Sequence, residues 1–110
     1  MTYEEIQNTL EKVGLPVAFY SFDEVQTGDF IAFLTEDVDE SFGNNETLGV
    51  AIQIRVELYT RQKDIAVEEK LEEVLTEIYP SWTTDPEQWL PTEQMFYKKY
   101  YFSFWQQKGK

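Results

Sequence analysis

Alternation of apolar and polar side chains is clearest between residues 48 and 60. Every second residue from Val50 onward is apolar, whereas the residues between them include Arg55 and Glu57. This period of two predicts a β-strand with one face in the core. At about 3.3 Å per residue, the strand would be roughly 36 Å long. We therefore expect it to project beyond its neighbours and to invite pairing with a neighbouring subunit.

Two segments show the period of an amphipathic helix. The first begins after Thr2, a suitable N-cap with Glu5 three residues later, and ends at Gly14. The second covers residues 64–79 and has an apolar stripe on one face. Its opposite face is expected to point its glutamates at solvent, and these are Glu68, Glu69, Glu72, Glu73 and Glu77.

Three further runs rich in β-branched and aromatic residues predict strands at 17–22, 29–35 and 92–105. The prolines between residues 80 and 91 allow short edge strands at most. The predicted order is α-β-β-β-α-β, and both helices can cover one face of a four-stranded, mainly antiparallel sheet. The fold class is therefore α+β, with one domain over residues 1–110.

The segment 36–47 is acidic and contains Gly and Asn, which predicts a long flexible loop. We expect the loop to become ordered against neighbouring subunits. A calcium loop beginning at Asp37 would need Gly at its sixth position and an acid at its twelfth. Phe42 and Leu48 occupy these positions, so an EF-hand is excluded.

The sheet face opposite the helices is the second candidate contact surface. It would carry the polar side of the long strand and part of the aromatic last strand. Together with the acidic loop, this gives a set of candidate subunit or partner contacts: Glu36, Asp37, Asp39, Glu40, Phe42, Arg55, Glu57, Tyr59, Tyr97, Tyr101 and Trp105.

Composition removes most catalytic and metal chemistries. The chain has no Cys and no His, so it lacks cysteine nucleophiles, thiolate metal sites and Ser-His-Asp arrangements. No phosphate-binding loop or nucleophile elbow is present, and the helical glutamates lack the second half of a metal site. We expect no catalytic residue, no cofactor and no bound metal.

The net charge of −12 argues against direct binding to nucleic acid or to anionic membranes. Lys98 and Lys99 lie among aromatic residues, as in proteins that bind single strands, but two lysines make a weak basic groove. A strand with a subunit-contact face explains this run better. The N-terminus lacks the features of a signal peptide, so we expect synthesis and folding in the cytosol.

One block of sequence resembles a known family. Residues 54–60 and 63–64 form the pattern R-x-E-L-Y-T-x-x-K-D, and the acidic amphipathic stretch 68–75 follows it. This arrangement is similar to the small tail-completion, or tail-to-head joining, proteins of siphophages and prophages of Gram-positive bacteria. The likeness extends to residues 14–17 and 93–97.

The resemblance implies an α+β structural protein of the virion, located at the junction of tail and head. Such a subunit would form a hexameric ring that ends the tail tube and binds the head connector or head-closure protein. It could be a monomer before assembly, and it would need no cofactor. The family has no active site to transfer. The aromatic segment from Trp82 to Trp105 and the strong acidity depart from the family pattern, which leaves the contact surface to be derived from physical arguments.

Two alternatives stay open from the sequence. An acidic inhibitor that mimics DNA would occupy the basic groove of a nucleic-acid-binding protein, and the charge favours it. Its acids, however, are shared between the loop and the second helix. Another virion component, such as a head-closure or tube subunit, would differ in its position along the same axis.

Overall fold

The structure is a computed structural model that describes residues 2–22, 24, 26–43 and 46–107. For residues 40–43, 46–48 and 107 it describes the backbone. The elements in chain order are α1 (Tyr3–Leu10), the 3₁₀ turn η1 (Glu11–Val13), β1 (Val17–Phe19), β2 (Phe30–Gly43), β3 (Glu46–Thr60), α2 (Ile65–Ile78), β4 (Thr83–Thr84), β5 (Gln88–Leu90) and β6 (Met95–Gln107).

The sheet has six strands in the order β1-β2-β3-β6-β4, and β5 pairs with a further part of β6. β1 is parallel to β2 and the other pairs are antiparallel, so the sheet is mixed. The α+β composition with two helices was predicted correctly, but the four-stranded, mainly antiparallel sheet and the order α-β-β-β-α-β were wrong. β4 and β5 are two and three residues long, too short to show a period in the sequence.

The acidic segment 36–47 is also different from the prediction of a loop. Residues 36–43 continue β2 and residues 46–47 begin β3, and the two strands pair antiparallel here, while residues 44–45 of the predicted loop lie outside the described residues. The register shifts between Thr35 and Asp37, which marks a β-bulge at Glu36. Asp and Glu have low strand propensity, but pairing along the whole of β3 outweighs it.

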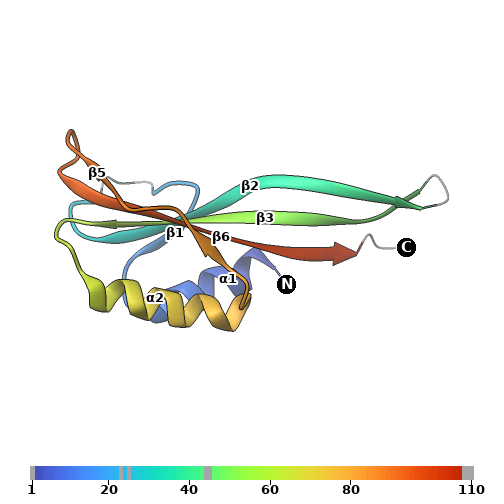
Figure 1. The fold of residues 1–110 in the computed structure, drawn as a ribbon, viewed down its shortest axis with the longest axis horizontal. Helices are drawn as coiled ribbons and strands as arrows, with labels where there is room; N and C mark the ends of the chain where they lie inside the picture. Colours follow the sequence, from blue (N-terminus) through green and yellow to red (C-terminus); the bar gives the residue numbers. More distant parts are fainter. Residues whose placement is uncertain (1, 23, 25, 44–45, 108–110) are drawn as a thin grey trace.

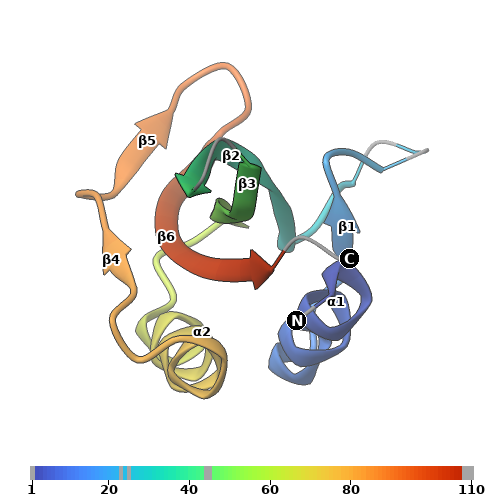
Figure 2. The same ribbon diagram turned by 90° about the vertical axis from the view of Figure 1, so that its right-hand side faces the viewer.

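Both helices lie on the same face of the sheet (Figures 1 and 2). Leu10 of α1 and Leu71 of α2 are fully buried against Val56 of β3 and its neighbours. The predicted alternation along β3 is confirmed, because the even-numbered residues from 52 to 58 are in the core. These side chains form the main apolar core: Ile6, Leu10, Ile31, Phe33, Ile52, Ile54, Val56, Leu58, Leu71, Leu75, Tyr100, Phe102 and Phe104.

The helix ends follow the local signals in the sequence. The Thr2 side chain accepts a hydrogen bond from the Glu5 N–H at 3.1 Å, and the Asp64 side chain accepts one from the Val67 N–H at 3.1 Å. Gly14 adopts a left-handed conformation with φ of 97° directly after η1. The two N-caps therefore fix where α1 and α2 begin, and Gly14 ends the 3₁₀ turn that continues α1.

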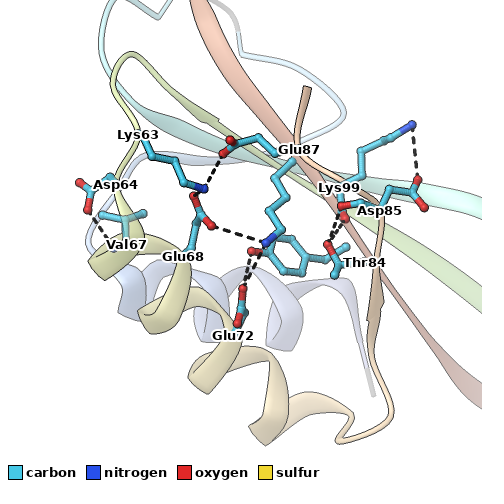
Figure 3. Close-up of polar contacts among 11 residues, drawn as sticks. Lys63, Asp64, Val67, Glu68, Glu72, Thr84, Asp85, Glu87 and Lys99 are labelled. Carbon is cyan, nitrogen blue, oxygen red and sulfur yellow. Dashed lines mark hydrogen bonds and ion pairs between the residues drawn. The ribbon is translucent and has the colours of Figure 1, made fainter. Parts of the chain in front are cut away.

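A polar cluster joins α2 to the sheet (Figure 3). Glu68 is 7% exposed and accepts from Lys63 at 2.7 Å, while Lys98 of β6 lies 3.5 Å away. The buried Tyr100 donates to Glu72 at 2.9 Å. The prediction that Glu68 and Glu72 point at solvent was wrong, because Lys98 and Tyr100 of β6, both distant in sequence, contact these two carboxylates.

Beyond the helices, three strands continue as an extension that we call the arm (Figure 1). The arm consists of residues 36–43 of β2, 46–53 of β3 and 102–107 of β6. It makes the molecule elongated, with extents of 52 × 26 × 24 Å. α1 covers only the base of the arm, where Tyr3 lies beside Phe104. The strands continue past the ends of both helices (Figure 1).

Candidate subunit-contact surface

The sheet face away from the helices carries a polar cluster built around the buried Glu57. Tyr97 donates to Glu57 Oε2 at 2.7 Å, and Tyr59 donates to Glu57 Oε1 at 3.2 Å. Arg55 lies between two carboxylates, with Nη1 at 2.8 Å from Glu36 and Nε at 3.0 Å from Glu57. Within the described chain Arg55 Nε has no hydrogen-bond partner, so its attraction to Glu57 is ionic. We call these five residues the Glu57 cluster.

The register of three strands explains how the Glu57 cluster forms. Tyr59 of β3 lies opposite Tyr97 of β6, and their rings stack with centroids 4.8 Å apart. Phe30 of β2 lies opposite Tyr59 on the other side, with centroids 4.5 Å apart. Cross-strand aromatic pairs of this kind stabilise the sheet and hold the rings in one orientation. The cluster is therefore a stiff surface.

The electrostatics keep the two phenols protonated. Burial and the neighbouring Glu57 raise the pKa of Tyr59 to about 12, and the same causes raise the pKa of Tyr97 further. Burial alone would lower the pKa of Arg55, but Glu57 and Glu36 raise it. Both phenols are thus hydrogen-bond donors and the guanidinium is a fixed cation. The cluster can therefore bind and orient a partner through fixed donors and charges.

The structure brings together some of the residues predicted from the sequence and separates others. Glu36, Arg55, Glu57, Tyr59 and Tyr97 form the Glu57 cluster. The Tyr101 hydroxyl instead donates to Asp85 at 2.8 Å.

The remaining predicted residues belong to the arm. Asp37 and Asp39 are exposed there, and Trp105 is 53% exposed. The side chains of Glu40 and Phe42 lie outside the described residues.

Trp105 covers a glycine on the arm. A Cβ atom at Gly49 would lie 2.8 Å from Trp105 Cε2 and from the Gln106 carbonyl oxygen, which is closer than real contacts allow. Gly49 therefore leaves room for the indole. Val38 is another large apolar residue of the arm and is 47% exposed. The arm thus presents apolar surface to solvent on residues that the core does not use.

A groove of about 560 Å³ lies at the other end of this sheet face. Phe30, Tyr59 and Met95 form part of its floor, and Tyr20 and Leu90 belong to its walls. Sequence reasoning missed this groove. Its walls come from the connections after β1 and β5, and no local pattern indicates that these two segments face each other.

Two classes of site are not found among the residues that the structure describes. No group of three acidic residues is close enough to hold a metal ion. None of the described helices has the length and apolarity needed to cross a membrane.

Comparisons with known proteins give no assignment. No protein-family model matches the chain, and no curated protein matches it.

Proposed function

We propose that this protein is a structural subunit of a long-tailed bacteriophage that completes the tail and joins it to the head connector. In this role it forms a ring, which we expect to be hexameric, on the end of the tail tube. It acts by binding its own copies, the tube protein and the connector, and it catalyses no reaction.

The arm is the single observation that carries this proposal. A domain of this size can bury its core with strands that end where the helices end, whereas β2, β3 and β6 continue well past α1 and α2 (Figure 1). The extension contains the exposed Val38 and Trp105, which do not contribute to the main core. Apolar surface on a projecting sheet is typical of a subunit that becomes buried on assembly.

The resemblance in sequence supports the same conclusion. Its block over residues 54–64 contributes Arg55, Glu57 and Tyr59 to the Glu57 cluster. The acidic stretch that follows contributes Glu68 to the contacts between α2 and β6. The block therefore has a physical role in shaping the sheet and in attaching the helix to it.

The alternative of a DNA mimic gains less support. Mimicry requires carboxylates that are free to replace phosphates, but several are engaged with basic groups in this chain. Glu36 and Glu57 contact Arg55, and Glu68 contacts two lysines. These carboxylates are held by basic groups of the same chain and are not free to replace phosphates.

Deletion of the gene from the phage or prophage that carries it tests the role. After induction, negative-stain electron microscopy of the lysate should show filled heads beside separate tails, many of abnormal length. Normal virions would overturn the proposal. A pull-down that recovers host nucleases with the protein would then favour the acidic inhibitor.

A further inference from the structure

The arm has two backbone edges that lack a strand partner in the described part of the chain. β1 covers the outer edge of β2 as far as Phe33, whose carbonyl accepts from the Tyr20 N–H at 2.8 Å. On the other side, β4 and β5 cover β6 as far as Tyr101. Beyond these residues the outer edges of β2 and β6 are open among the described residues. Open edges are templates for the addition of another strand.

The register shows which backbone groups of β2 point outward. Ile31 donates its N–H to the Pro16 carbonyl at 2.9 Å, so odd-numbered residues of this part of β2 face the outer edge. The register shift between Thr35 and Asp37 reverses this order, and Val38 then faces outward. Consistent with this, the Val38 N–H donates to Asp37 Oδ1 at 2.9 Å. The Asp37 carboxylate thus binds a backbone N–H that points to the outer edge of β2.

On β6 the outward groups belong to Ser103 and Trp105. The Lys99 carbonyl accepts from the Asp85 N–H at 3.2 Å, outside the pairing with β3, so odd-numbered residues of β6 face the outer edge. Backbone groups of successive residues point to opposite edges of a strand, so those of Ser103 and Trp105 point to the same edge as those of Lys99. Their outward groups have no strand partner within the described chain.

The donors and acceptors on these two edges can pair with each other. β2 and β6 run in the same direction, because each is antiparallel to β3. If two arms point the same way, Val38 of one copy can lie beside Phe104 of the next. In such a parallel pair the Val38 N–H faces the Ser103 carbonyl, and the Val38 carbonyl faces the Trp105 N–H. Both Val38 and Phe104 lie beside Ile52 within one copy, so the apolar face would continue across the junction.

Charge selects this pair of edges over a pair of β2 edges. Asp37 and Asp39 are exposed on β2, whereas residues 103–106 of β6 carry no charge. Two β2 edges would place carboxylates opposite one another, which destabilises a cross-strand pair. A β2 edge against a β6 edge avoids this repulsion. The contact is heterologous, and repetition of a heterologous contact gives a ring or a filament.

We propose that the β6 edge of one copy, at residues 103–105, pairs in parallel with the β2 edge of the next copy, at residues 38–40. Asp37 opposes this pairing in the free protein, because its carboxylate must release the Val38 N–H before a neighbour can bind. The inference deepens the proposed function, on which it rests for the ring, by assigning the surface through which the copies bind each other.

Disulfide cross-linking tests the pairing, since the chain has no Cys of its own. Asp39→Cys, Ser103→Cys and Trp105→Cys lie on one face of the sheet and are made as single variants. Asp39→Cys is mixed with each of the other two under oxidising conditions, in samples that sediment as assemblies. The matched control is Gln53→Cys, on the same face of the central strand β3, which has strands on both sides.

At least one of the two mixtures should give a mixed disulfide dimer. Its yield should be several-fold higher than the yield of dimer from either single variant and from the Gln53→Cys control. The more efficient partner defines the register. Predominant Asp39→Cys homodimers, Ser103→Cys homodimers, or assemblies without cross-links would overturn the pairing, as would a protein that stays monomeric at every concentration and salt tested. The measurement uses purified protein, so a failure here is distinct from a failure of tail joining, which is scored on virions.

Discussion

At the scale of single residues, Asp37 is the side chain with the clearest effect on assembly. Its carboxylate accepts from an outward N–H of its own strand, and it adds negative charge to the edge. Asp37→Ala removes both obstacles, so the variant should associate at several-fold lower protein concentration than the wild type. Sedimentation velocity over a concentration series measures this.

The control for that change is Asp39→Ala, which removes the same charge from the same strand without removing a bond to the Val38 N–H. It should shift association less than Asp37→Ala does. Equal shifts for the two variants would mean that charge alone opposes association.

The tyrosines of the Glu57 cluster give stability a defined pH dependence. A phenol in the unfolded chain loses its proton near pH 10, whereas the folded protein raises the pKa of Tyr59 to about 12 and that of Tyr97 further. The folded state therefore keeps protons that the unfolded state has lost. This contribution to the free energy of unfolding is complete below pH 10 and is lost as the pH rises through the folded pKa values.

Urea denaturation between pH 7 and pH 11 measures this dependence, with Tyr97→Phe as the test variant. The variant should lose about 1–2 kcal/mol at pH 7, because Glu57 keeps fewer donors, and its stability should fall less steeply above pH 10. Tyr101→Phe is the control, since its partner Asp85 is half exposed, and its loss at pH 7 should be smaller. Parallel curves for wild type and Tyr97→Phe would contradict this assignment.

At the scale of elements, α2 depends on a carboxylate that its amphipathic pattern assigns to solvent. Burial alone would raise the pKa of Glu68, but the hydrogen bond and charge of Lys63, together with Lys98, lower it. Glu68→Gln should cost about 1–3 kcal/mol, because Lys63 and Lys98 each lose one of two carboxylate partners. The exposed neighbour Glu69→Gln should stay within about 0.5 kcal/mol of the wild type in chemical denaturation. Equal effects of the two would refute the role of Glu68.

The sequence predicted the elements whose signals are local. Thr2, Asp64 and Gly14 mark helix ends through their own backbone contacts, and the alternation in β3 follows from one buried face. The predicted strands 48–60 and 92–105 include most of the β3 and β6 parts of the arm, whereas its β2 part, residues 36–43, was predicted as a loop. These acidic residues have low strand propensity, and pairing with β3 determines their conformation. The segment between residues 80 and 91 was predicted to hold short edge strands at most, and the predicted four-stranded sheet did not include β4 and β5. Contact with β6, not their own composition, makes them strands.

The candidate surface was predictable in part for the same reason. Alternation along β3 placed Arg55, Glu57 and Tyr59 on one face, and the register of β6 brings the predicted Tyr97 beside Tyr59. The inward position of Glu68 and the groove near Met95 depend on segments far apart in sequence. The open edges depend on where β1 and β4 end, which no pattern in the chain reveals.

At the scale of the whole molecule, the charge of −12 opposes the approach of two copies. Salt screens this repulsion, with a Debye length of about 10 Å at 0.1 M and about 3 Å at 1 M. Backbone hydrogen bonds and apolar contacts between arms are affected much less. Sedimentation should therefore show association that strengthens from 0.05 to 1 M NaCl. Weaker association at high salt would indicate that ion pairs between copies dominate.

The most direct test of the central claim is complementation in vitro. Purified protein is added to a lysate of the deletion phage, and infectious particles are counted as plaques while joined virions are counted by electron microscopy. We expect separate heads and tails to become infectious virions as protein is added, and a folded Ser103→Pro variant to fail where Ser103→Ala succeeds. A deletion lysate that already contains infectious virions, or one that folded wild-type protein does not restore, would contradict the assignment to tail joining.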